Sequence, residues 1–207
     1  MIKVILIFIS LFFVNACSSS YEKLKNTNGR MSDNFKDNLF KLYKEKAVFE
    51  AEEMHDWNSA KLYSEKALKA LNGYDLKPQD IKYWKLPKNK VSEIQISYDN
   101  LMSVYKRAQK IDPNNLAVAI SSLDCWAEQQ EENWQSWDII RCKDDFLNSM
   151  HTIYNTIAKI DKNNLPSKNK DNESDNLSLA LKSNNKEIIQ IVYFDFDKSK
   201  LSRVSIN

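Results

Sequence analysis

Apolar side chains recur three and four positions apart through most of residues 33–160, the spacing that gathers them on one face of an α-helix. Pro78 and Pro87 interrupt this pattern, so we expect a loop over 76–90. A short turn between the first two helical segments favours an antiparallel hairpin. The pattern thus predicts a mainly α-helical bundle. Its five helices run from Asn34 to Met54, Trp57 to Leu71, Val91 to Ile111, Asn115 to Glu131 and Ser136 to Ile160.

The pattern of apolar and polar positions changes twice after this region. Residues 161–187 are dense in Asn, Lys, Ser and Asp, and they have too few apolar side chains to offset the entropy of ordering. Residues 188–207 open with the β-branched and aromatic run Ile188 to Phe196, which is typical of a strand. We therefore expect a helical domain over 33–160, then a disordered linker and one orphan β-strand.

The first 16 residues resemble a bacterial signal peptide. The apolar run from Val4 to Val14 is too short to cross a bilayer, which takes about 20 apolar residues. The sequence Val-Asn-Ala-Cys at Val14 to Cys17 resembles the lipobox of bacterial lipoproteins, in which the cysteine thiol accepts a diacylglycerol. The resemblance implies lipidation at Cys17, stable membrane anchoring by several acyl chains and a polar tether over 17–32. A secretory signal with an incidental cysteine is the alternative.

Composition narrows the function class. The 30 basic and 28 acidic side chains give a net charge of +2, which does not indicate a nucleic-acid partner. Only 2 residues are glycine, which disfavours phosphate-binding loops and tight β-turns. The sequence has no nucleotide fingerprint and no zinc spacing. We therefore expect a noncatalytic protein without a cofactor or metal.

Two short segments resemble tetratricopeptide-type repeats. The turn from His55 to Ala60 matches the inter-helix turn of such a repeat, and Ala67 lies where the repeat packs a small residue. A second fragment spans Ala108 to Asn114. Because about three repeats are needed to bury a continuous core, a helical bundle with repeat-like hairpins and a true repeat fold both stay open.

A more specific resemblance lies near the end of the chain. The run Ile191 to Leu201 resembles the opening strand of the OmpA-like peptidoglycan-associated domain. The stretch from Asp124 to Cys142 is similar to the helical amino-terminal region of such proteins in alphaproteobacteria. With the lipobox, this implies an OmpA-family lipoprotein anchored on the periplasmic face of the outer membrane, because Ser18 after Cys17 resembles lipoproteins sent there.

The resemblance also sets an expectation about the cell wall. In that family the domain continues beyond this strand, and the Asp and Arg that bind the wall's diaminopimelate lie in the continuation. No binding residue can be matched within 188–207, so we expect a truncated domain with lost or impaired peptidoglycan binding. The alternative function is a repeat-like lipoprotein scaffold that binds other envelope proteins through its helical grooves.

Cys125 and Cys142 are the candidate disulfide. Each lies 8 residues from the centre of the link near Asn133 and Trp134, so antiparallel helices would bring them level. In an oxidising compartment, a disulfide closing this loop would contribute on the order of 3 kcal/mol. Two inert core thiols are the alternative.

The remaining polar candidates have ordinary structural interpretations. Glu128, Glu131 and Glu132 are interpreted as a solvated helix end or as charges that pair helices, not as the paired acids of a glycosidase. His55 is expected in a turn and His151 on a helix surface, since no nucleophile motif accompanies either one.

Several aromatic and carboxylate residues elsewhere also have ordinary structural interpretations. Trp126, Trp134 and Trp137 are expected in the core, because aromatic residues at helical spacing usually pack there, although a recognition surface is the alternative. Asp195 and Asp197 alone do not complete a calcium or magnesium shell.

Overall fold

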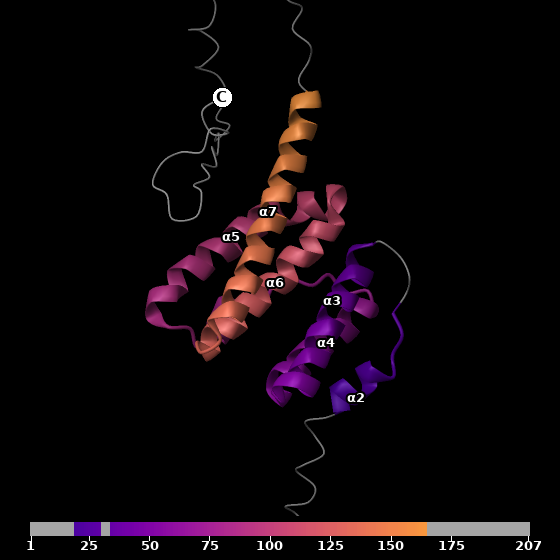
Figure 1. Ribbon diagram of the computed structural model, residues 1–207. Helices are drawn as coiled ribbons and strands as arrows, with labels where there is room; N and C mark the ends of the chain where they lie inside the picture. The colour runs from indigo at the N-terminus through magenta and orange to yellow at the C-terminus, as the bar shows by residue number, and fades with distance from the viewer. Residues whose placement is uncertain (1–18, 30–33, 165–207) are drawn as a thin grey trace, which may run out of the picture. The chain divides into compact units, whose positions relative to one another are not determined.

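The structure, a computed structural model, describes residues 19–29 and 34–164 (Figure 1). Within these ranges the chain is mainly helical and has no strand, which confirms the predicted helical bundle. The predicted signal peptide and Cys17, most of the predicted linker and the predicted strand lie outside the described residues. The helices are α2 (Ser19–Lys25), α3 (Phe35–Phe49), α4 (Trp57–Leu71), α5 (Lys88–Ile111), α6 (Pro113–Glu132) and α7 (Ser136–Asn164), with a π-helical turn η1 (Glu50–Met54) and a 3-10 turn η2 (Ile81–Tyr83).

Helix boundaries follow from local capping. The side chain of Asn34 accepts a hydrogen bond from the backbone at the start of α3, and Asp56 caps α4 in the same way. Asp112 caps α6, and Pro113 occupies the first helical position, where its missing N–H costs nothing. Asn133 ends α6 in the left-handed region, at φ 55°. These signals explain why α6 differs by only one or two residues from its predicted bounds.

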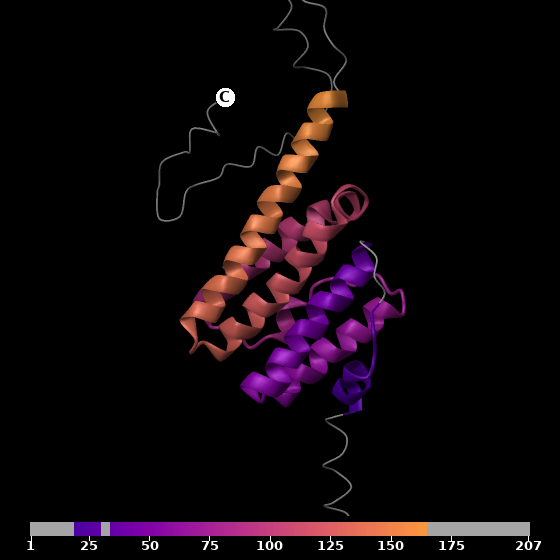
Figure 2. The same cartoon turned by 45° about the vertical axis from the view of Figure 1, so that its right-hand side comes forward.

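Helix α6 forms the centre of the bundle. It packs against α7, α3 and α5, and α3 pairs with α4 (Figures 1 and 2). Fourteen of its 20 residues are buried, so it has no wide solvent face, as expected for a core helix. Its largest fully buried apolar side chains are Leu116, Ile120, Leu123 and Trp126.

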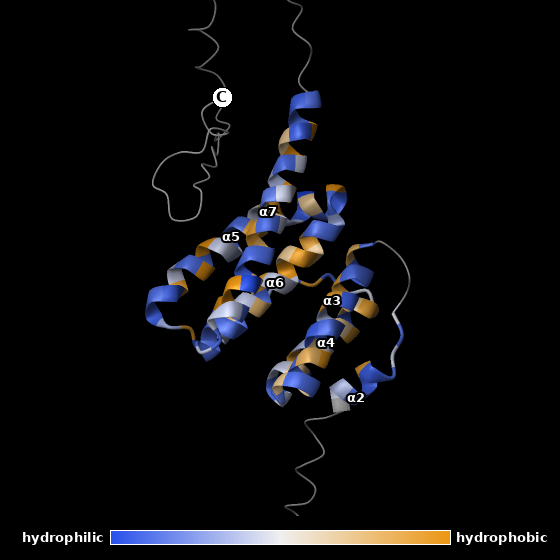
Figure 3. Cartoon of the chain, in the orientation of Figure 1, coloured by the Kyte–Doolittle hydropathy of each residue, from blue (hydrophilic) through white to orange (hydrophobic). Residues whose placement is uncertain are grey.

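Helix α7 covers one side of α6 and then continues past it. Its buried side chains include Cys142, Phe146, Met150 and Ile153, at spacings of three and four. The 29 residues of α7 correspond to a length of about 43 Å. They include 161–164, so the prediction that the linker begins at 161 was wrong for these four residues, whose polar side chains extend the helix without an apolar period. Its carboxyl-terminal turns project beyond the neighbouring helices and are largely hydrophilic (Figures 2 and 3). Among the described helices, none has the length and apolar content needed to cross a membrane.

Helix α2 is a correction to the sequence analysis. Part of the segment expected to be a polar tether is helical, and its Tyr21 and Leu24 are buried against α4. The Tyr21 hydroxyl donates to Glu52 Oε1 at 2.7 Å, and Lys25 forms an ion pair with the same carboxylate. A helix of seven residues has too few turns to produce a recognisable apolar period.

A buried ion pair connects α4, α6 and the loop after α4. Asp124 of α6 is 1% exposed, and its Oδ2 accepts hydrogen bonds from Lys66 Nζ at 2.5 Å and from the Tyr43 hydroxyl at 2.6 Å. Its Oδ1 accepts from the backbone N–H of Gln79, also at 2.6 Å. One carboxylate therefore fixes the loop to the bundle.

Candidate functional site

Four carboxylates gather where η1, the start of α4 and the end of α6 meet. We call Glu50, Asp56, Glu128 and Glu132 the acidic corner. One carboxylate oxygen from each of Glu50, Asp56 and Glu128 lies within 4.8 Å of the others. Glu132 is close enough to affect the pKa of both Glu50 and Glu128. The corner thus brings together residues up to 82 positions apart, counted from Glu50 to Glu132.

The π-helical turn brings two of these side chains to the corner. The backbone N–H groups of His55 and Asp56 both donate to the Glu50 carbonyl, so the helix widens by one residue before it stops. His55 has φ 56°, in the left-handed region, and the chain then reverses into α4. Asp56 caps α4 with Oδ1, which accepts from the backbone of Asn58 at 2.8 Å. Turns of this kind often occur at functional sites.

Two of the carboxylates are buried and incompletely paired. Glu50 is 4% exposed and Glu128 is 3% exposed. Glu128 Oε2 accepts a hydrogen bond from Gln129 Nε2 at 2.8 Å. Within the described ranges, Glu50 Oε2, Glu128 Oε1 and Gln129 Oε1 have no hydrogen-bond partner. Most buried polar atoms in proteins are satisfied, so this concentration at one place requires a physical explanation.

Burial and mutual repulsion raise the pKa values of the corner. Burial, followed by the charge of Glu128, raises the pKa of Glu50 to about 8. Burial also raises the pKa of Glu128 to about 7, although the hydrogen bond from Gln129 opposes the shift. The pKa of the exposed Glu132 is raised as well, chiefly by partial burial. Lys46 is the cation that acts on Glu50, and burial lowers its own pKa.

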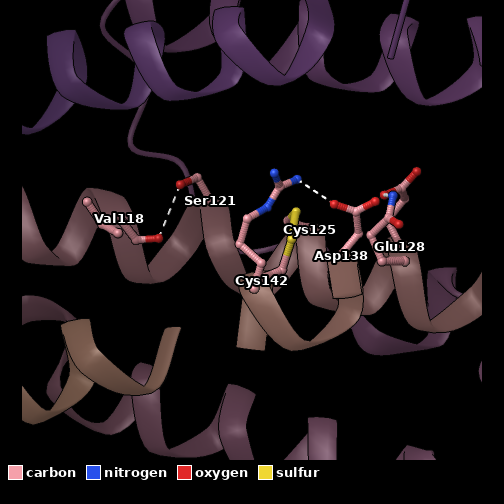
Figure 4. The surroundings of a disulfide bond; sticks show 8 residues. Val118, Ser121, Cys125, Glu128, Asp138 and Cys142 are labelled. Carbon is pink, nitrogen blue, oxygen red and sulfur yellow. Dashed lines mark hydrogen bonds and ion pairs between the residues drawn. A yellow bond between two sulfur atoms is a disulfide. The ribbon is translucent and has the colours of Figure 1, made fainter. Parts of the chain in front are cut away.

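The predicted cysteine pair lies beside the corner. Cys125 of α6 and Cys142 of α7 form a disulfide with a Cα–Cα distance of 5.7 Å, in the usual range (Figure 4). Glu128 follows Cys125 by three residues. Near the start of α7, Asp138 pairs with Arg141 at 2.7 Å, and the Arg141 guanidinium lies over the Phe49 ring. The disulfide therefore fixes the start of α7 next to the corner.

The acidic residues predicted at the end of α6 require one correction. Glu132 is exposed, but Glu128 is buried, so the interpretation of the whole group as a solvated helix end was wrong for Glu128. The reason is that α6 is enclosed on several sides, and the pattern of one helix does not reveal its neighbours. Glu50 and Asp56 were not identified at all. A usable signal was present, because Glu50 takes the next position in the apolar stripe of Tyr43 and Ala47.

The three tryptophans expected in the core differ in burial. Trp126 is buried as predicted, whereas Trp134 and Trp137 are exposed, so the core prediction was wrong for these two. Both lie at the α6–α7 turn, where a helix end leaves side chains uncovered. His55 lies in a turn and His151 on the surface of α7, as the sequence indicates. Neither the predicted lipidation site Cys17 nor the pair Asp195 and Asp197 belongs to the described residues.

The chain has no match among known protein families, curated proteins or solved structures.

Proposed function

We propose that this chain is a noncatalytic, lipid-anchored cell-envelope protein of the OmpA-family type, held by Cys17 at the periplasmic face of the outer membrane. The anchor part of this proposal rests on the lipobox. The family part rests on the run Ile191 to Leu201, which resembles the opening of the OmpA-like domain. The helical domain then acts as a spacer between the membrane and the carboxyl-terminal segment.

The positions of the first and last helices at opposite ends of the bundle are the observation that best supports a spacer. Helix α2 begins two residues after Cys17 and contacts Glu52 in η1, at the acidic-corner end of the bundle. Helix α7 begins at the same end and runs away from it for about 43 Å. In Figures 1 and 2, α2 and the end of α7 lie at opposite ends of the bundle. The two ends of the described bundle therefore lie far apart, which suits a protein that spans a distance.

Exposed tryptophans support a membrane-facing end. Trp57, Trp134 and Trp137 are 46%, 67% and 66% exposed. Trp57 starts α4 beside Asp56, its ring lies 6.1 Å from that of Tyr21, and Trp134 donates to Glu132. All three thus belong to the end that carries α2. Indole rings favour the membrane–water interface, where the apolar ring and the polar N–H are both satisfied.

The repeat-like scaffold is the second candidate. The hairpin of α3 and α4 has the turn from His55 to Ala60 at its bend, and Ala60 and Ala67 are fully buried, as small residues at close helix crossings are. The exposed apolar side chains of Ile140 and Leu147 on α7 favour a protein partner. A pull-down distinguishes the two. Stoichiometric co-purification of an envelope protein favours the scaffold. A chain that fractionates with the outer membrane, recovers no such protein and is weakly retained by purified peptidoglycan is what the lipid-anchored protein with impaired wall binding predicts.

The anchor and its orientation can be tested together. In cells fed a labelled fatty acid, the parent chain should take up label and fractionate with the outer membrane, and Cys17→Ser should do neither. Label in Cys17→Ser would contradict the anchor. In vesicles with brominated lipids, the fluorescence of the lipidated chain should be quenched. A variant with Trp57→Phe, Trp134→Phe and Trp137→Phe should lose most of that quenching, because the remaining tryptophans, Trp84 and Trp126, are buried. Equal quenching in both proteins would contradict the membrane-facing end.

A further inference from the structure

Two neutral side chains next to the acidic corner carry polar atoms without partners. In the part of the chain that the structure describes, the Tyr63 hydroxyl and Gln129 Oε1 have no hydrogen-bond partner, although Tyr63 is fully buried and Gln129 is 2% exposed. The amide of Gln129 lies against the corner, because its Nε2 donates to Glu128 Oε2 at 2.8 Å. A half-turn of this amide exchanges its nitrogen and oxygen and would present Oε1 to the corner. Of the charged groups around the Tyr63 hydroxyl, Glu128 has the largest electrostatic effect. Such atoms commonly mark the place of a bound ion or water.

The spacing of the carboxylates is compatible with a bound divalent cation. The oxygens of Glu50, Asp56 and Glu128 lie within 4.8 Å of one another. Oxygens on opposite sides of Ca²⁺ are about 4.6 to 5.2 Å apart, whereas those of Mg²⁺ are about 4.0 to 4.2 Å apart. Ca²⁺ also accepts uneven sets of carboxylate and carbonyl oxygens, whereas Mg²⁺ requires near-octahedral geometry. The spacing admits both ions, and the mixed donors favour calcium.

We propose that the acidic corner binds a calcium ion through Glu50, Asp56 and Glu128, with the amide oxygen of Gln129 as a neutral donor. Glu132, exposed at the end of α6, adds negative charge beside the site. The bound ion connects η1, the start of α4 and α6, and so stabilises the end of the bundle that carries α2.

Nearby cations of the protein compete with the ion only in part. Arg141 of α7 already pairs with Asp138 at 2.7 Å. Lys46, one helical turn before Glu50, contributes positive charge to Glu50 and Glu128 and is repelled by Arg141. One lysine does not balance three carboxylates, and the surplus negative charge is what attracts a divalent cation.

Calorimetric titration of the purified, chelator-treated full chain with CaCl₂ tests the proposal. We expect one site with a dissociation constant on the order of 10⁻⁴ to 10⁻³ M, and a melting temperature that rises with calcium concentration. Glu50→Gln and Glu128→Gln should each weaken binding at least about tenfold, because each removes a charged ligand. Glu53→Gln is the matched control, since Glu53 is an exposed acid in the same turn η1. Circular dichroism checks that each variant folds.

Two further measurements do not depend on the folding of those variants. Lys46→Met should tighten calcium binding, because it removes a competing cation. Tb³⁺ luminescence excited through nearby aromatic rings should appear in the parent chain and decline as Ca²⁺ is added. Absence of calcium binding in the parent, equal weakening in Glu53→Gln, equal affinity for Mg²⁺ or weaker binding in Lys46→Met would each overturn the proposal.

Discussion

Two carboxylates one turn apart on α6 have opposite surroundings. Asp124 and Glu128 are both almost completely buried. Asp124 accepts hydrogen bonds from the Lys66 ammonium, the Tyr43 hydroxyl and a backbone N–H, so its charge is balanced within the fold. Glu128 has only neutral donors, Gln129 and Ser59, among the described residues, and it faces other carboxylates. A balanced buried charge holds the fold together, whereas an unbalanced one must take up a proton or a cation.

The largest loss of stability is expected from removing the charge of Asp124, which its buried partners balance. Asp124→Asn leaves Lys66 charged and buried, and it should lower the free energy of unfolding by about 3 to 5 kcal/mol. Urea denaturation followed by circular dichroism measures the loss. Asp161→Asn makes the same chemical change in the exposed pair with Arg107, and it should cost less than about 1 kcal/mol. Similar losses in the two variants would show that the buried Asp124 network contributes no more to stability than an exposed ion pair does.

Removing the disulfide should have the next largest effect. Cys125 and Cys142 are 17 positions apart, so the double variant Cys125→Ser, Cys142→Ser should lose about 3 kcal/mol through the freed unfolded chain. Reductant should destabilise the parent chain and leave the double variant unchanged. A loss in the double variant on adding reductant would contradict the assignment.

The sequence predicts the longer helices well because each contains several apolar periods. The bounds of α4 are the same in prediction and structure, and Asp112, Pro113 and Asn133 delimit α6 by capping chemistry that is visible in the chain. The cysteine pair could also be found, since symmetry about a short link fixes the register of two antiparallel helices. Each of these features depends on residues that are close in sequence.

The acidic corner depends on contacts between distant segments, and this is why it was missed. Glu50 and Glu128 belong to separate helices, and only the packing of α3 against α6 brings them together. The same packing encloses Glu128, which the pattern of α6 alone indicates to be solvated. The predictions that failed are thus those in which the burial of a polar or aromatic side chain depends on a neighbouring helix.

The pH dependence of stability should reveal the buried, unbalanced charge of the acidic corner. The folded pKa of Glu50 is about 8, above its ordinary value of 4.5, so the folded state holds more protons between these two values. The contribution of Glu50 to stability should therefore be fully present below about pH 4.5 and be lost as the pH rises to about 8. With chelator present, Glu50→Gln should reduce this decline and add on the order of 1 to 2 kcal/mol above pH 8, after allowance for screening.

Glu53→Gln provides the control for this measurement. Glu53 is exposed in the same turn, so its substitution should leave the slope of stability against pH unchanged. A parent chain whose stability is constant from about pH 5 to 8 would contradict strong burial of the Glu50 charge.

The smallest effect is expected at the turn that brings Glu50 and Asp56 together. His55 is a non-glycine residue at φ 56°, so His55→Gly should relieve backbone strain and stabilise the chain by up to about 1 kcal/mol. Asn133→Gly, at φ 55°, makes the matched change at the end of α6. It should gain less, because asparagine tolerates this conformation and its side chain accepts a hydrogen bond from Gln130 at 2.9 Å. Thermal unfolding measures both changes.

Neither substitution touches a carboxylate, so calcium affinity should stay within about twofold of the parent. A large loss of affinity in His55→Gly alone would show that the imidazole, whose Nδ1 lies 3.3 Å from the Ala51 carbonyl, holds the π-helical turn in its binding shape.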